Sequence, residues 1–145
     1  MTRTIRAAAF ALAAATATAT ATIGLAGAAQ AHHSFAMFDP AKVVTLQGRV
    51  KEYRWVNPHV ALLLDVAAPG NGGGVWAVEL TSPGNLTRLG WSRKSLKPGD
   101  RVAVEINPLR DGQHGGGFRK LTLLDTGQVL QARLIDIEKN AAAGH

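Results

Sequence analysis

The segment Val43–Val66, VVTLQGRVKEYRWVNPHVALLLDV, decides the fold because it holds two strand patterns joined by a proline turn. Alternate positions of its first half are apolar or glycine: Val44, Leu46, Gly48 and Val50. The apolar positions then move to Tyr53 and Trp55, and such a shift of parity predicts a β-bulge near Lys51–Glu52. Asn57–Pro58 ends this strand, because proline cannot donate a hydrogen bond to a strand ladder.

Further strand patterns follow on the C-terminal side of the turn. We expect strands over His59–Val66, Val75–Leu80, Arg101–Ile106, Phe118–Leu124 and Gln128–Leu134. Their alternation predicts a shared core made by Val60, Leu62, Leu64, Val102, Val104 and Ile106. Asp65, Glu79 and Glu105 fall on outward positions. We expect the glycine-rich stretches Pro69–Gly74 and Arg110–Gly117 to be loops.

A short helix is expected between the third and fourth strands. Ser82 suits the N-cap, Pro83 suits the first helical position, and Gly90 suits a left-handed C-terminal cap. A long bulged first strand with a helix between strands three and four predicts an all-β domain, a small OB-like Greek-key barrel. An open β-sandwich is the alternative.

The N-terminus has the pattern of an export signal. Arg3 and Arg6 precede an Ala/Thr-rich apolar run, and Ala29-Gln30-Ala31 provides a small-x-small cleavage site. We therefore expect residues 1–31 to be a cleaved signal peptide, with the mature protein periplasmic or secreted. An arm over 32–42, a barrel domain over 43–137 and a flexible tail over 138–145 should follow.

Composition excludes several classes of function. The leader carries two of the 16 Lys and Arg residues and no acidic residue, so the remainder has a net charge of 14 − 10 = +4. These charges are scattered, so we expect no nucleic-acid partner. The chain has no cysteine, which excludes disulfides, thiolate metal sites and lipobox anchors. After the leader, no apolar stretch is long enough for a transmembrane anchor.

The histidines are the candidate metal ligands. Cleavage after Ala31 would leave His32 at the mature N-terminus, where amine and imidazole form a chelate suited to Cu(II). The other candidate ligands are His33, His59 and His114, and zinc would accept the same groups. The alternative is that His33 caps the arm and that His59 has a structural hydrogen bond.

Four aromatic residues form a candidate ligand groove: Tyr53, Trp55, Trp76 and Trp91. The alternative for the tryptophans is a place in the core. The sequence contains no nucleophile motif and no phosphate-binding loop, because neither glycine run is followed by Lys-Ser/Thr. It therefore predicts no catalytic residues.

Several motifs together resemble an uncharacterised exported bacterial family, domain-of-unknown-function family six-one-five-two. They are His32-His33-Ser34-Phe35, Leu46-Gln47-Gly48, Trp55–His59, Trp76–Pro83, Gly90-Trp91, Ser95–Asp100 and Asp111-Gly112. The resemblance implies an exported small β domain and no established activity. The chain departs from the family pattern after Gly112, so a site that includes His114 has no support from the resemblance.

The leading interpretation is a non-enzymatic exported binding module whose ligand is unknown, with copper at the terminal histidine as a candidate. A second interpretation is an accessory protein that docks onto an envelope partner through the aromatic arm. A third is a copper redox enzyme, because a terminal-histidine site can also activate oxygen.

Overall fold

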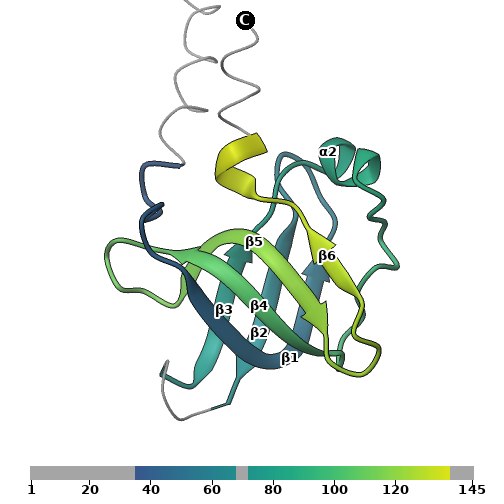
Figure 1. Cartoon of the computed structure of the whole chain (residues 1–145), viewed down its shortest axis with the longest axis horizontal. Coiled ribbons are helices and arrows are strands. Elements are labelled where there is room, and N and C mark those ends of the chain that lie inside the picture. The colour runs from purple at the N-terminus through teal and green to yellow at the C-terminus, as the bar shows by residue number, and fades with distance from the viewer. Residues whose placement is uncertain (1–34, 68–71, 138–145) are drawn as a thin grey trace, which may run out of the picture. The chain divides into compact units, whose positions relative to one another are not determined.

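The computed structural model describes residues 35–67 and 72–137. It contains six strands and one short helix in the order β1 (Val44–Arg54), β2 (Ala61–Val66), β3 (Gly74–Glu79), α2 (Pro83–Arg88), β4 (Arg101–Pro108), β5 (Gly115–Leu123) and β6 (Val129–Gln131). A helical turn over 134–137 follows β6 (Figure 1). The chain divides into two units, Met1–Ala36 and Met37–His145, and the second unit contains all of these elements.

Strand β1 is the centre of the sheet, since it pairs with β2 on one side and with β4 on the other. Its register against β2 shifts between Val50 and Glu52, which confirms the bulge predicted from the parity shift. Gly48 permits the two strands to approach closely here, because a Cβ at this position would overlap the carbonyl oxygen of Asp65. One long bent strand can therefore belong to both halves of a curved sheet.

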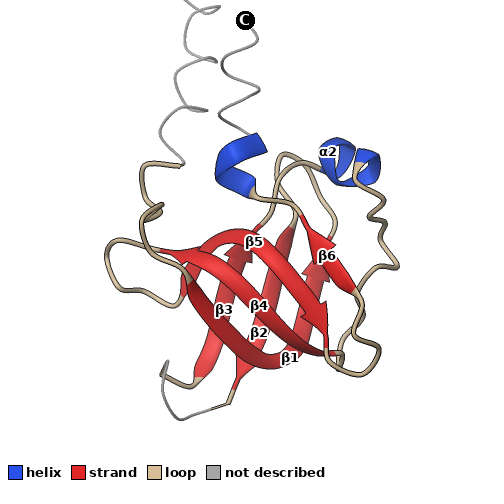
Figure 2. Ribbon diagram, in the orientation of Figure 1, coloured by secondary structure: helices blue, strands red, loops and turns tan. Residues whose placement is uncertain are grey.

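The sheet closes into a barrel. Five strands form the ring β1-β2-β3-β5-β4, in which only β3 and β5 run parallel to each other (Figure 2). Strand β6 extends β5 beyond that seam. This strand order and the helix between β3 and β4 are those of an OB-type barrel, so the prediction is confirmed and the open sandwich is excluded.

The loop predicted over Arg110–Gly117 is confirmed for residues 110–114 and was wrong for the three glycines that follow. Gly115–Gly117 belongs to β5, and its residues pair with Ala77, Val78 and Glu79 of β3. Glycine permits β5 to lie close to both of its neighbours. A Cβ at Gly115 would lie 3.0 Å from the Ala77 carbonyl oxygen of β3, and one at Gly116 would lie 2.5 Å from the Asn107 carbonyl oxygen of β4. A run that reads as a flexible loop is instead the seam that closes the barrel.

The core has the predicted composition. All six predicted inward side chains are fully buried: Val60, Leu62, Leu64, Val102, Val104 and Ile106. Trp76, Trp91 and Phe118 join the same cluster. Burial of these apolar groups supplies the main stabilisation of a domain without disulfides.

Helix α2 begins as expected, and the last strand is shorter than expected. The Ser82 hydroxyl accepts a hydrogen bond from the Asn85 backbone N–H, and Pro83 occupies the first helical turn. Gly90 has φ = +86°, which glycine adopts at low cost. The strand predicted over Gln128–Leu134 covers only Val129–Gln131, because the chain enters a helical turn at Leu134.

One buried amide attaches the segment before β1 to the barrel. The Asn107 side chain, 2% exposed, donates to the carbonyl oxygen of Lys42 at 2.7 Å and accepts from Arg119 at 3.2 Å. Phe38, also 2% exposed, forms a β-bridge with Leu109. Residues 37–42, predicted as part of an irregular arm, are thus packed against the end of β4.

Candidate functional site

An open cavity of about 560 Å³ lies beside the seam between β3 and β5. Its base comes from β2, β3 and the first residues of β5, and its walls come from the Met37–Phe38 segment and the β4–β5 loop. The apolar lining residues are Met37, Phe38, Val60, Ala61, Ala77, Val78 and Leu109. OB-type barrels bind ligands on the β2–β3 face between the β1–β2 and β4–β5 loops, and this cavity occupies the same place.

A histidine–carboxylate pair provides polar atoms in this cavity. His59 Nδ1 lies 2.5 Å from Glu79 Oε1, and the two side chains are 25% and 30% exposed. His59 lies two residues before the start of β2. Glu79 is the last residue of β3 and pairs with Ala61 of β2. The short distance orients both side chains, which fixes the carboxylate at the cavity wall.

A second histidine lines the cavity from the β4–β5 loop. The His114 ring stacks on the Trp76 indole with centroids 4.6 Å apart and an interplanar angle of 6°. The backbone holds the loop in place, since the His114 carbonyl accepts a hydrogen bond from the Ala77 N–H at 3.0 Å. The Trp76 Nε1–H donates to the Gly72 carbonyl at 3.2 Å. His114 therefore covers one face of a tryptophan that is itself 7% exposed.

The structure brings together two of the four candidate metal ligands. His59 and His114 line the same cavity, whereas His32 and His33 lie outside the described residues. Across 35–67 and 72–137, no three His, Asp or Glu side chains are grouped closely enough to hold a metal ion. The copper hypothesis therefore depends on the N-terminal histidines and stays a prediction.

The four aromatic residues of the predicted groove occupy different environments. Trp91 is buried against Phe118 in the core, with centroids 5.4 Å apart, and Trp76 belongs to the same core cluster. Tyr53 and Trp55 form an edge-to-face pair with centroids 5.8 Å apart. None of the four lines the cavity at the β3–β5 seam. The alternative interpretation, a place in the core, describes Trp76 and Trp91.

Tyr53 has a buried hydroxyl. Within the part of the chain that the structure describes, its oxygen has no hydrogen-bond partner. Burial raises the pKa of Tyr53, because the charged phenolate would lose its hydration. The hydroxyl therefore stays protonated at neutral pH.

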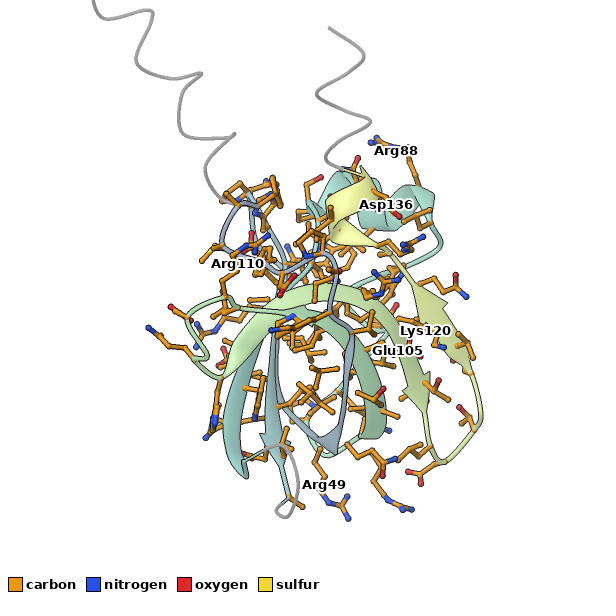
Figure 3. All side chains as sticks on the ribbon, turned by 60° about the vertical axis from the view of Figure 1, so that its left-hand side comes forward. Arg49, Arg88, Glu105, Arg110, Lys120 and Asp136 are labelled. Atoms are coloured by element: carbon orange, nitrogen blue, oxygen red, sulfur yellow. The ribbon has the colours of Figure 1, made fainter. Side chains whose placement is uncertain are left out.

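A second cavity, of about 400 Å³, has a different chemical character. It is lined by two arginines, Arg49 and Arg101, together with Gln47, Asp65 and Leu124. Arg49 and Arg101 face each other across β1 and β4. Figure 3 shows Arg49 at the end of the barrel away from Arg110, which belongs to the β4–β5 loop of the first cavity.

Sequence reasoning missed Glu79 and Leu109 as cavity residues. Glu79 was assigned to an outward strand position, which is correct, because the cavity lies on the outer face of β2 and β3. The signal that could have found it is parity: Glu79 and Ala77 share a face, and both line the cavity. No helix among the described residues has the length and apolarity needed to span a bilayer.

Comparison with known proteins identifies a family. No curated protein and no solved structure gives a significant match to the chain. A family model with the description "Family of unknown function" matches residues 19–118, a stretch that contains every residue lining the cavity at the β3–β5 seam. Because that match covers more than half of the sequence, the chain belongs to the Family of unknown function (DUF6152).

Proposed function

We propose that the protein is a non-enzymatic binding module whose ligand occupies the cavity beside the β3–β5 seam. The observation that carries the proposal is the composition of this cavity at this place in the barrel. Its body is apolar, and a few polar side chains converge on it: His59, Glu79, Gln113 and His114. Small-molecule sites have this make-up and a volume of roughly 300–1,000 Å³.

The cavity is preorganised, which favours binding. Its wall residue Phe38 is buried, and the Asn107 amide holds the adjoining backbone at the Lys42 carbonyl. The β4–β5 loop is held to β3 through the His114 carbonyl. Ligand binding to such a site spends little free energy on ordering side chains or loops.

We also propose that the module works outside the cytoplasm. The support is the leader pattern of residues 1–31, which lie outside the described part of the chain.

A cavity-filling substitution tests the binding function. Ala77 is exposed on β3 and lines the cavity, so Ala77→Trp should fill the space that a ligand needs. Val75 is also exposed and lies two residues earlier on the same face of β3, outside the lining, so Val75→Trp is the matched control. The protein is titrated with 2-phenylethanol, an uncharged and largely apolar probe. Binding is measured from the ¹⁵N chemical shifts of the backbone amides.

In the parent protein we expect saturable shifts at Ala61, Ala77 and Gly115. Ala77→Trp should abolish them and Val75→Trp should leave the affinity within about twofold, because only the first removes volume from the site. Absence of saturable shifts in the parent protein, or equal binding by both variants, would reject the cavity as the ligand site. Co-purification with an envelope protein would then favour the docking interpretation.

A further inference from the structure

The charges around the two cavities differ, although both belong to the same basic domain. Neither Lys nor Arg is among the described residues that line the cavity at the β3–β5 seam, and Arg110 of the neighbouring loop is not part of the lining. The cavity at the other end of the barrel contains Arg49 and Arg101. With histidines neutral, the only formal charge in the first lining is the carboxylate of Glu79.

The Glu79 carboxylate is held where a ligand can reach it. The His59 ring, 2.5 Å from Oε1, fixes its position, and the carboxylate side chain remains 30% exposed. An ionised carboxylate has about four acceptor sites on its two oxygens, and the contact with His59 uses one of them. Further donors can therefore bind the carboxylate without breaking the pair.

The rest of the lining selects for an apolar ligand body. Ala61, Ala77 and Leu109 present methyl groups to the cavity, and Gly115 and Gly116 present backbone without side chains. In so apolar a lining the attraction of a carboxylate for a cation is stronger than in water, and repulsion of an anion is stronger too. The cavity thus combines an apolar body with one carboxylate, that of Glu79, which is paired with His59.

We propose that this cavity binds an organic ammonium ligand, with its apolar body beside Ala77 and Leu109 and its cationic nitrogen at Glu79. An ammonium group has three N–H donors and no acceptor, which complements a carboxylate. The proposal rests on the binding function proposed above and adds the chemical class of the ligand. It excludes carboxylates and phosphates as the preferred ligands of this cavity.

Three probes of similar size that differ in their head groups test the proposal. They are phenethylammonium, 2-phenylethanol and 3-phenylpropanoate, each titrated at pH 7 and followed by the amide shifts of Ala61, Ala77 and Gly115. We expect phenethylammonium to bind about tenfold more tightly than the alcohol, as a charge-assisted hydrogen bond implies. The carboxylate probe should bind more weakly than the alcohol.

The Glu79→Gln variant removes the charge and keeps the shape of the side chain. This variant should bind phenethylammonium only as tightly as it binds 2-phenylethanol. Its affinity for 2-phenylethanol should equal that of the parent protein. Glu105→Gln is the matched control, because Glu105 lies 2.5 Å from Lys120 on β4 and β5, outside the cavity. Figure 3 shows that pair on the outside of the sheet. This control should leave all three affinities unchanged.

Salt provides a second test that needs no substitution. Phenethylammonium affinity should fall severalfold between low and high NaCl, and alcohol affinity should not, since salt screens only the charged interaction. If the alcohol binds and the ammonium binds no more tightly, the ammonium proposal is wrong and the binding module remains. If neither probe shifts the cavity amides, both proposals are wrong.

Discussion

At the scale of single residues, Tyr53 was predicted to line a ligand groove, but its side chain has two opposing effects on stability. Its ring packs on the core and on Trp55, and its hydroxyl is buried without a partner in the described chain. A buried hydroxyl that lacks a hydrogen bond costs roughly 1–3 kcal/mol. The ring therefore stabilises the fold while the oxygen opposes it.

Replacing Tyr53 by phenylalanine tests this balance. We expect Tyr53→Phe to raise the free energy of unfolding by up to about 1 kcal/mol, because the ring remains and the unpaired hydroxyl is removed. The pKa of Tyr53 is raised in the folded state, so the unfolded chain loses this proton first as the pH rises. Stability of the parent protein should thus fall as the pH rises above about 10, and this part of the decline should be absent in Tyr53→Phe.

Urea denaturation of both proteins between pH 7 and pH 11 measures the two effects. Their difference in unfolding free energy should grow above pH 10. A constant difference across that range would mean that the hydroxyl is solvated in the folded protein.

At the scale of elements, the seam between β3 and β5 determines whether the sheet is a barrel. We expect Gly116→Ala to lower the free energy of unfolding by about 1–3 kcal/mol, because its Cβ would meet the Asn107 carbonyl and the Ile106 side chain. Gly84 is the control, since it lies in α2 with 4.0 Å between its Cβ position and the nearest atom, Ser82 Oγ. Gly84→Ala should stabilise by about 0.5–1 kcal/mol.

Thermal and chemical denaturation of the two alanine variants checks this contrast. If Gly116→Ala is as stable as the parent protein, then the barrel does not need the close approach of β5 to β4 at Gly116.

Elements defined by local alternation could be predicted from sequence, and elements defined by distant partners could not. The bulge in β1 and the inward positions of β2 and β4 follow from the spacing of apolar residues within one strand. The strand over Gly115–Gly117 has no side chains to alternate, so its pairing with β3 leaves no trace in the local pattern. The cavity was missed for the same reason, because it forms only when that pairing brings Leu109 and Glu79 to one place.

At the scale of the whole molecule, the leader pattern of residues 1–31 predicts where an exported chain would begin. We expect cleavage between Ala31 and His32, because Ala29 and Ala31 are the small residues that the peptidase requires. Intact-mass measurement of the exported protein gives the first residue directly. A mature chain that starts anywhere else would remove the basis for a terminal-histidine chelate.

Copper binding is tested on that processed protein. We expect Cu(II) to bind with a dissociation constant below about 1 μM, equivalent to about −8 kcal/mol. Binding should weaken as the pH falls through the range near 6.5 in which imidazoles take up protons. One alanine inserted before His32 should weaken binding as much as His32→Ala, because both changes destroy the amine–imidazole chelate. Calorimetry that shows only weaker binding would reject the copper hypothesis.

The β3–β5 seam has a further consequence, which concerns time. Three residue pairs join strands that are far apart in the sequence, so loop-closure entropy opposes this contact more than any hairpin of the barrel. A region that is held by few hydrogen-bonded residue pairs opens locally more often than the rest of a fold. Ala77 and Gly115 belong both to the seam and to the cavity lining, so local opening of the seam would change the shape of the cavity. Substitutions that weaken the seam should therefore shorten the time for which the cavity keeps its shape.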